Sequence, residues 1–423
     1  MKCNNKFSTF GLACGLLLSL SVVAAPLSDA QSSAARGRTF NVQSYGAKGD
    51  GTTDDTESIQ NALKDANRQS DSTVYFPPGK YLFTGEFVAS GAGITMRGQN
   101  ATLLPDDPDA YILLSGDRSS ILDLAFAKVD RNFPPPITPI NQIVVDGARN
   151  YRISGNKFDV LPDEAASAVV FHWCVWVKNN ASAGLITNNQ MLAPGGIRLT
   201  NAISTSVRQN RISGNLRPSL IPFELQSIGV LNESGQSNSI TDNNLTGISS
   251  QNVFRSDGIR AERGSGSIVQ RNTINGFTSG IVENASINPQ INNNVMTCAV
   301  IPLGINFTKG AIDLDNVRAA SVINNRVNRS ARDSIRCASC LDSLIISQNV
   351  LADAGLENER EIGLESSVIF VDSPDIKVIR IQSNRYSGNT RKVKYFIECK
   401  QPSPPAVVSG NFTNTMLPNR IGP

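Results

Sequence analysis

A short phrase, apolar–x–x–Asn–x–apolar, recurs along the chain between about residue 150 and residue 412. It reads ISGNKF at residues 153–158, ITNNQM at residues 186–191 and VRQNRI at residues 207–212. The asparagines of the phrase are Asn156, Asn189, Asn210, Asn243, Asn272, Asn294, Asn325, Asn349, Asn384 and Asn411. Successive asparagines are 21 to 35 residues apart, so a fixed phrase alternates with filler of variable length. This pattern predicts a solenoid whose loops absorb the insertions.

Each copy of the phrase is too short for a helix and alternates apolar with polar residues, so we interpret it as a strand. A second strand is indicated by an apolar residue thirteen positions before the asparagine. These residues are Ile143, Trp176, Ile197, Val230, Ile259, Ile281 and Ile312. A coil of about 22 residues or more, rising by the strand spacing of about 4.8 Å, predicts an all-β parallel β-helix with two strands per coil.

The repeated asparagine suits a bend between strands, because this side chain tolerates the left-handed backbone conformation. Stacked copies can also pass side-chain hydrogen bonds from one coil to the next. Repeated positions serve the repeat, so we predict that the ten asparagines hold the scaffold together and do not form a site.

The first 30 residues have the pattern of a secretory signal peptide: Lys2 and Lys6 precede an apolar run at residues 10–25, and small residues follow at 28–30. The run is too short for a confident membrane span, so we expect export, to the periplasm or the medium, without stable membrane insertion. Residues 38–412 contain no obvious linker and are predicted to form one domain, with a loose tail at 413–423. The formal net charge of +3 does not argue for nucleic acid.

The segment at residues 45–56, YGAKGDGTTDDT, precedes a helical apolar stripe at Ile59, Ala62, Leu63 and Ala66. We predict that residues 38–84 form the first coil and an amphipathic helix that caps the open end of the solenoid. Acids in a first helical turn are ordinary, so Asp50, Asp54 and Asp55 are interpreted as part of this cap and not as catalytic residues.

Together, YGAKGDGTTDDT and VYFPPGKYLF at residues 74–83 resemble the start of the pectate-lyase-superfamily proteins, which are right-handed parallel β-helices. Polygalacturonases, mannuronan epimerases and tailspike depolymerases begin in a similar way. The resemblance implies this fold with an N-terminal capping helix, and it implies a polysaccharide partner. It does not select the reaction, because one fold can carry several activities.

Four long insertions follow an asparagine strand and precede the next strand, at residues 159–166, 213–227, 297–309 and 352–366. Because they occupy the same point of the coil, they should rise on one side of the solenoid and wall a long groove. Alternate strand residues face outward, so the groove-side sheet should present the residues twelve and ten positions before each asparagine. The first column is Arg198, Leu231, Arg260, Val282 and Asp313, and the second is Thr200, Glu233, Glu262, Asn284 and Asp315.

These columns bring acids together with arginines. Asp257 stands at the start of the strand that contains Arg260 and Glu262. Glu233 should lie one coil from Glu262, and Asp313 and Asp315 should lie two coils beyond Glu262. Hydrolysis of a sugar chain uses two carboxylates, and elimination from a uronic acid uses a base and a cation that stabilises the anion. The predicted catalytic residues are Asp257 and Glu262 as acid and base, assisted by Glu233 and by Asp313 or Asp315.

Arg198 and Arg260 are predicted to bind substrate carboxylates. The alternative is a solvated row of salt bridges, in which Arg198 pairs with Glu233 and Arg260 with Glu262 at little energetic gain. The tetrapeptide at residues 256–259, SDGI, resembles the Asn-Thr-Asp-Gly-Ile motif of polygalacturonases, whose catalytic aspartate matches Asp257. The paired aspartates and the histidine of that family are missing at residues 278–280 and 309–311, which argues against ordinary polygalacturonase activity.

Trp173 and Trp176 lie close to His172, the only histidine, in the segment FHWCVW at residues 171–176. They are predicted to bind substrate by stacking on sugar rings. Burial in the core is the favoured alternative, because large apolar clusters are usually buried.

Five cysteines follow the signal segment, at positions 174, 298, 337, 340 and 399. Cys337 and Cys340 lack the further ligands of a zinc site, and the disulfide pairing stays open. We predict no cofactor or metal, since nothing in the sequence supports a Ca²⁺ site. The sequence therefore favours an exported enzyme that cleaves an acidic polysaccharide. A non-catalytic glycan-binding or matrix protein and a polysaccharide epimerase are the alternatives.

Overall fold

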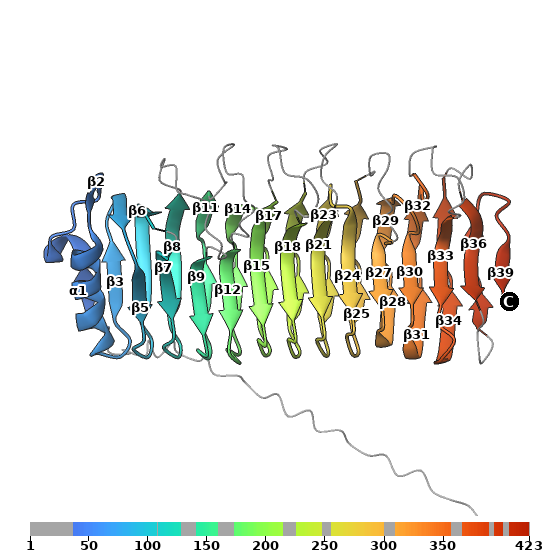
Figure 1. Cartoon of the computed structure of the whole chain (residues 1–423), viewed down its shortest axis with the longest axis horizontal. Helices are drawn as coiled ribbons and strands as arrows, with labels where there is room; N and C mark the ends of the chain where they lie inside the picture. The colour runs from blue at the N-terminus through green and yellow to red at the C-terminus, as the bar shows by residue number, and fades with distance from the viewer. Residues whose placement is uncertain are drawn as a thin grey trace, which may run out of the picture. The chain divides into compact units, whose positions relative to one another are not determined.

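The computed structural model describes residues 37–107, 109–127, 141–159, 173–214, 226–247, 255–299, 309–356, 366–388, 393–400 and 406–422. The expected signal at residues 1–30 and most of each long insertion lie outside these ranges. Residues 37–423 group into one compact unit. In this unit the strands of successive coils lie side by side in parallel, from α1 at the blue end to β39 at the red end (Figure 1). The predicted right-handed parallel β-helix is confirmed.

One sheet, which we call sheet B, contains 13 parallel strands. They are β5 (Glu86–Ala89), β7 (Tyr111–Leu114), β9 (Asn141–Asp146), β12 (Trp173–Lys178), β15 (Gly195–Thr200), β18 (Gln226–Glu233), β21 (Arg255–Glu262), β24 (Ser279–Asn284), β27 (Ile312–Asp315), β30 (Ile335–Ala338), β33 (Ser366–Asp372), β36 (Val393–Lys400) and β39 (Asn419–Ile421).

The remaining 26 strands form two rows on either side of a bend. Row A1, before the bend, contains β1 (Thr39–Asn41), β3 (Thr73–Phe76), β10 (Arg152–Ser154), β13 (Leu185–Thr187), β16 (Ser206–Arg208), β19 (Ser239–Thr241), β22 (Ile268–Gln270), β25 (Gln290–Asn292), β28 (Arg318–Ile323), β31 (Leu341–Ser347), β34 (Ile376–Gln382) and β37 (Val407–Ser409). Row A2, after the bend, contains β2 (Asp50–Asp54), β4 (Gly79–Phe83), β11 (Lys157–Asp159), β14 (Gln190–Leu192), β17 (Arg211–Ser213), β20 (Asn244–Thr246), β23 (Thr273–Asn275), β26 (Val295–Thr297), β29 (Arg326–Arg329), β32 (Val350–Ala352), β35 (Arg385–Ser387) and β38 (Phe412–Thr413). β6 (Thr95–Pro105) and β8 (Ser120–Ala127) run through both rows.

A repeating coil therefore contains three strands, and the expectation of two was wrong. The repeated phrase is not one strand: Val207 lies in β16, Ile212 lies in β17, and Asn210 stands at the bend between them. Both strands remain parallel to their counterparts in the next coil. The four insertions all connect the end of an A2 strand to the start of a sheet B strand.

The left-handed conformation falls on the residue before each asparagine, not on the asparagine itself. Asn188, Gln209, Asp242 and Arg271 have φ of 55°, 55°, 58° and 52°, and each precedes a ladder asparagine. The expected role of the asparagine backbone was therefore wrong. The asparagine acts through its side chain, whose hydrogen bonds hold the bend.

The ten asparagines form a continuous hydrogen-bonded ladder inside the bend, as predicted. Asn243 Oδ1 accepts from the backbone N–H of Asn210 at 3.0 Å and from Asn210 Nδ2 at 3.0 Å. Its own Nδ2 donates to Val207 O at 2.9 Å and to Asn272 Oδ1 at 3.0 Å. The same pattern runs from Asn156 to Asn411. One side chain thus satisfies two buried backbone groups of the preceding coil and also donates to the asparagine side chain of the following coil.

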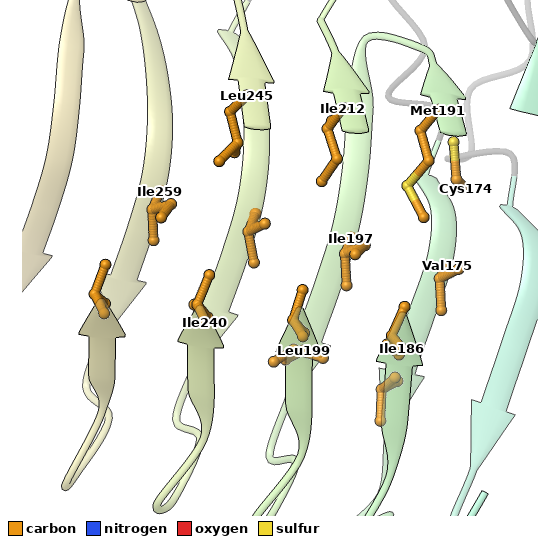
Figure 2. Packing of buried hydrophobic residues seen from close by; sticks show 14 of the residues in the cluster. Cys174, Val175, Ile186, Met191, Ile197, Leu199, Ile212, Ile240, Leu245 and Ile259 are labelled. Carbon is orange, nitrogen blue, oxygen red and sulfur yellow. The ribbon is translucent and has the colours of Figure 1, made fainter. Parts of the chain in front are cut away.

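Apolar side chains fill the interior in columns, one for each strand of the coil. Figure 2 shows Ile186 and Ile240 from row A1, Met191, Ile212 and Leu245 from row A2, and Val175, Ile197 and Ile259 from sheet B. All of them are buried. Because equivalent residues stack directly on one another, burial in one coil depends on the coils on either side.

Helix α1 (Thr56–Asn67) follows the 3-10 turn η1 (Val42–Tyr45) and contacts β1, β3 and β5. The stripe of Ile59, Ala62, Leu63 and Ala66 is buried against these strands. Asp55 is also buried, and it accepts hydrogen bonds from the backbone N–H groups of Lys48 and Gly49 at 2.6 and 3.0 Å. It therefore holds the glycine-rich loop and does not cap the helix with its side chain. No helix of the described residues is long and apolar enough to cross a membrane.

The C-terminal segment differs from the loose tail expected at residues 413–423. Residues 419–421 form β39, which pairs with β36 in sheet B. Backbone hydrogen bonding at the open edge of the last coil accounts for this order. Among the cysteines, Cys337 and Cys340 are joined in a disulfide, and Cys174, Cys298 and Cys399 are free and buried.

One acid lies in the interior among these apolar columns. Glu283 in β24 faces inward between Ala261 and Leu314 of the adjacent coils. It is fully buried, and Ser267 Oγ donates to its Oε1 at 3.1 Å. Burial raises the pKa of Glu283 to about 7, against the opposing effect of hydrogen bonds from Ser286 and Ser267.

Replacing one ladder asparagine should destabilise the solenoid. In Asn243→Ala, buried groups on Asn210, Val207 and Asn272 lose partners, and we expect a loss of about 3 kcal/mol in the free energy of unfolding. The measurement is urea unfolding followed by far-UV circular dichroism. Asn244→Ala, at the exposed neighbouring position, is the control and should change the midpoint little. Equal midpoints for the two variants would contradict the role of the ladder.

The core acid predicts a specific dependence of stability on pH. The folded-state pKa of Glu283 lies above its unfolded value, so the folded state binds the additional proton, and stability is lost as pH rises from about 4.5 to about 7. The free energy of unfolding of Glu283→Gln should equal that of the wild type near pH 4 and exceed it by about 3 kcal/mol near pH 8. Thermal unfolding across this pH range measures the difference. Glu57→Gln, exposed on α1, should show no such trend; a constant difference for Glu283→Gln would refute the assignment.

Candidate functional site

The outer face of sheet B carries the two predicted columns in register. Arg198 pairs with Leu231, which pairs with Arg260, and the column continues through Val282 to Asp313. The second column runs from Thr200 through Glu233, Glu262 and Asn284 to Asp315. The prediction that these side chains share one face is therefore confirmed at the level of strand register.

Trp176 does not occupy the core position that its distance from Asn189 suggests. Val175 faces the interior in register with Ile197, and Trp176 is the outward neighbour of Arg198. Val175 lies fourteen residues before Asn189, one more than in the neighbouring coils, and a shift of one residue moves a strand side chain to the other face. Trp176 therefore joins the outer column.

Trp176, Arg198, Thr200 and Glu233 form one connected group. Arg198 Nε and Nη2 each lie 2.8 Å from Glu233 Oε2, and Thr200 Oγ1 donates to the same oxygen at 3.2 Å. Trp176 Nε1 donates to Thr200 Oγ1 at 3.1 Å, and the Arg198 guanidinium lies 5.2 Å from the centroid of the Trp176 ring. Lys178 Nζ lies 4.9 Å from that centroid. The indole is therefore held beside two cations.

One coil further along, Arg260 connects the predicted acid and base. Its Nε donates to Glu262 Oε1 at 2.5 Å, and its Nη1 donates to Asp257 Oδ2 at 3.4 Å. Asp257 is buried, whereas Arg260 and Glu262 are partly exposed. Glu233 lies directly beside Glu262 in the preceding coil. Two of the predicted catalytic residues, Asp257 and Glu262, thus contact the Arg260 guanidinium, and the third, Glu233, lies beside Glu262 and pairs with Arg198.

Asp313 and Asp315 separate into different environments. Asp313 is 1% exposed and lies 2.8 Å from Arg336 Nη1 and 3.8 Å from Lys309 Nζ. Asp315 is exposed, and its strand neighbours are Asn284 and Ala338. The structure therefore places Asp313 in a second charged group, centred on Arg336, and leaves Asp315 outside it.

Asp333 belongs to this second group and was missed from the sequence. It is buried and accepts a hydrogen bond from the backbone N–H of Ser367 at 2.8 Å. Burial raises the pKa of Asp333 to about 6; the nearby charge of Asp313 also raises it, and Arg332 and Arg336 lower it. Asp313 and Asp333 are thus two buried carboxyl groups whose charges interact, and groups of this kind are often found at functional sites.

A signal for Asp333 was available in the sequence. Asp333 stands two residues before the core residue Ile335, as Asp257 stands two residues before Ile259. Ile335 lies fourteen residues before Asn349, so a search for apolar residues thirteen positions before each asparagine did not find it. Glu398, two coils beyond Arg336 in the same outward column, is a further buried acid, and it accepts from Ser367 Oγ at 2.6 Å.

The surface that Trp173 and Trp176 were predicted to offer for stacking on sugar rings is only partly present. Trp173 is 3% exposed and packs with Ile228 and Leu231, so burial prevents its ring from serving as a solvent-facing platform. Trp176 is half-buried on the outer face. His172 lies outside the described residues. Among the residues described, no three His, Cys, Asp or Glu side chains are grouped as metal ligands.

The comparisons with known proteins concern mainly the start of the chain and the fold. Residues 39–105 match the family described as rhamnogalacturonase A/epimerase, pectate lyase-like. Alginate lyase 7 from Azotobacter vinelandii is 43% identical over 58 residues, which is 14% of this chain and 7% of the relative. Mannuronan C5-epimerase AlgE3 from the same organism is 41% identical over 58 residues, which is 14% of this chain and 3% of the relative. The chain therefore spans only a small part of these relatives.

Three solved structures are similar over most of the chain. The Dettilon tailspike protein aligns with a TM-score of 0.60 at 16% identity, over 91% of this chain and 68% of its own. The exopolygalacturonase of Thermotoga maritima gives 0.55 at 13% identity, over 88% and 92%. The Streptococcus pneumoniae surface protein and adhesin PfbA gives 0.56 at 15% identity, over 91% and 99%. At these identities the likeness shows the fold alone.

Loss of Arg336 should be costly, because among the described residues only the more distant Lys309 would remain as a counter-charge to the buried Asp313. We expect Arg336→Gln to lower the free energy of unfolding by about 3 kcal/mol. Arg271→Gln removes an arginine from the exposed pair with Asp242 and should cost less than about 1 kcal/mol. Chemical unfolding of both variants under one condition measures the two losses. Similar small losses would show that Asp313 does not depend on Arg336.

The predicted resemblance is thus confirmed: the segment at residues 39–105 is similar to the pectate lyase-like rhamnogalacturonase A/epimerase family, and the described chain has the right-handed parallel β-helix fold.

Proposed function

We propose that this protein binds and cleaves an acidic, uronic-acid-containing polysaccharide on the outer face of sheet B, by lyase or hydrolase chemistry. The observation that supports this most directly is the group of Asp257, Arg260, Glu262 and Glu233, in which Arg260 contacts Asp257 and Glu262, and Glu233 lies beside Glu262 in the preceding coil. The names of the alginate lyase and the mannuronan epimerase point to the same class of substrate.

In this proposal Arg260 binds the carboxylate of a uronic acid. A guanidinium has five N–H donors, so it can hold a substrate carboxylate together with its own acids. In elimination, one acid of the group takes the proton beside the substrate carboxylate, Arg260 stabilises the anion that develops, and a second acid protonates the departing glycosidic oxygen. In hydrolysis, the acids protonate that oxygen and activate the attacking water or nucleophile.

The remaining residues have supporting roles. Arg198 and Trp176 extend the substrate-binding surface along the solenoid, and Asp313 with Asp333 provides a second pair of carboxyl groups further along the same sheet. Trp173 and Asp315 have no direct role in this proposal, since the first is buried and the second stands apart. An exported location fits such a substrate, and the predicted signal at residues 1–30 supports it.

A non-catalytic glycan-binding protein is the second candidate. It is favoured by the pairing of Arg198 with Glu233 and of Arg260 with two acids, since such pairs also form where charges only stabilise a surface. A protein of this kind retains the polysaccharide and releases no product. An epimerase, the third candidate, changes the sugar configuration without shortening the chain.

Digestion of a glycan panel separates these functions. The protein is incubated with polygalacturonate, alginate and bacterial exopolysaccharides, and the products are read by mass spectrometry and by NMR. Unsaturated ends indicate elimination, new reducing ends without unsaturation indicate hydrolysis, and altered sugar configuration at constant length indicates epimerisation. Binding without any of these changes would reject cleavage.

Two variants then test the site. Asp257→Asn and Glu262→Gln should each lower kcat by about 100-fold or more, because each removes a proton-transferring group. Asp242→Asn, from the exposed pair with Arg271, should leave kcat unchanged. Circular dichroism verifies that all three variants are folded. Full activity in both site variants would move the reaction centre elsewhere, with Asp313 and Asp333 as the next residues to change.

A further inference from the structure

A column of ten exposed side chains runs along row A2, on a different sheet from the candidate site. Strand register connects every member to the next through β11, β14, β17, β20, β23, β26, β29, β32, β35 and β38. Its members are Lys157, Gln190, Arg211, Asn244, Thr273, Val295, Arg326, Val350, Arg385 and Phe412, and all ten are exposed. We call this set the A2 column.

The A2 column carries four cations and no acid. None of the ion pairs formed among the described residues includes Lys157, Arg211, Arg326 or Arg385. Arg326 Nε donates to the amide oxygen of Asn328 at 2.8 Å. The next outward column of row A2 contains one acid, Asp159, at the coil of Lys157.

This charge pattern is opposite to that of sheet B. There Arg198, Arg260 and Arg336 each lie against a carboxylate of the same face. The cations of the A2 column have no ion pair with a carboxylate of the part of the chain that the structure describes. Such exposed cations create a positive potential, which falls off over about 10 Å in dilute salt. Such a surface attracts a partner that brings its own negative charges.

The spacing of the column suits a long partner. Lys157 and Arg211 are two coils apart, as are Arg326 and Arg385, which corresponds to about 10 Å along the solenoid axis. Val350 lies between Arg326 and Arg385 and is 42% exposed, and Phe412 follows Arg385 and is 63% exposed. Cationic and apolar side chains therefore alternate along this end of the column.

We propose that the A2 column is a second glycan-binding surface, on which a linear carboxylated polysaccharide lies along the solenoid axis. A polyuronate presents a carboxylate on every sugar and apolar C–H groups on the faces of its rings. The first complements the arginines, and the second complements Val350 and Phe412. Nucleic acid fits less well, because the column has one aromatic side chain for base stacking and the whole chain has a formal net charge of only +3.

This surface would hold the protein on its polymer independently of the chemistry on sheet B. Single exposed charge pairs contribute little, so binding depends on several cations acting together and weakens as salt is added. The inference does not require that the protein is an enzyme. Binding at the A2 column can therefore be found in a protein that cleaves no polysaccharide, and cleavage on sheet B can be found without binding at the A2 column.

The test measures binding of the full-length chain to soluble alginate and polygalacturonate by calorimetry at several salt concentrations. Asp257→Asn and Glu262→Gln are combined in every protein used, so that cleavage does not obscure binding. The test variant adds Arg211→Gln, Arg326→Gln and Arg385→Gln. We expect its affinity to fall about tenfold and its salt dependence to become shallower.

A matched control removes the same amount of charge elsewhere. Arg97, Arg118 and Arg149 are exposed and paired with Asp123, Asp71 and Asp117, and changing these three arginines to Gln should leave affinity within about twofold. A second variant, Val350→Ser with Phe412→Ser, keeps the charge and should weaken binding a few-fold through lost apolar contact. Thermal unfolding verifies that every variant is folded.

Three outcomes would overturn the proposal. The first is unchanged affinity in the Arg211, Arg326 and Arg385 variant. The second is an equal loss in the matched control, which would show that only net charge matters. The third is tighter binding to a duplex DNA oligonucleotide than to alginate, which would assign the surface to another class of polymer. Neutral dextran should not bind in any case.

Discussion

The asparagine ladder is the interaction on which the rest of the structure depends. The bend between rows A1 and A2 buries polar backbone groups in every coil, and such groups are costly when they lack partners. An amide side chain has both an acceptor and a donor, so Asn243 can accept from Asn210 of the coil before it and donate to Asn272 of the coil after it. Because this exchange works only when the coils are in register, the ladder also fixes which outward residues become neighbours.

The outer faces show what this register allows. On sheet B, charges of opposite sign fall in adjacent coils, so Arg198 lies against Glu233 and Asp313 against Arg336. On row A2 the same geometry brings exposed cations and apolar side chains into one line without acids. The scaffold is common to both faces, and the difference between them comes entirely from the residues placed at outward positions.

The sequence predicted the solenoid, the ladder and the outward columns because these features repeat, and repetition is visible without coordinates of any kind. It failed where the repeat changes length. The core residue lies fourteen residues before the asparagine, instead of thirteen, in the coils of Asn189 and Asn349. The additional residue places Trp176 on the outer face in the first coil, and in the second it led the sequence analysis to miss Asp333. The division of each coil into three strands was also missed, since the bend at Asn210 interrupts a phrase that alternates like a single strand. Burial of Trp173 depends on contacts between different coils, and local patterning carries no information about those.

Parallel stacking spaces equivalent outward residues of successive coils at a fixed interval of about 4.8 Å. Two carboxylates on neighbouring coils stand about as far apart as the acids of glycosidases that retain configuration, and carboxylates two coils apart approach the separation found in those that invert it. Moving one acid by a single coil would therefore exchange one stereochemical outcome for the other while the scaffold stays as it is. In such a fold, the separation of two catalytic carboxylates can change by one strand spacing at a time, with no need to reshape a loop.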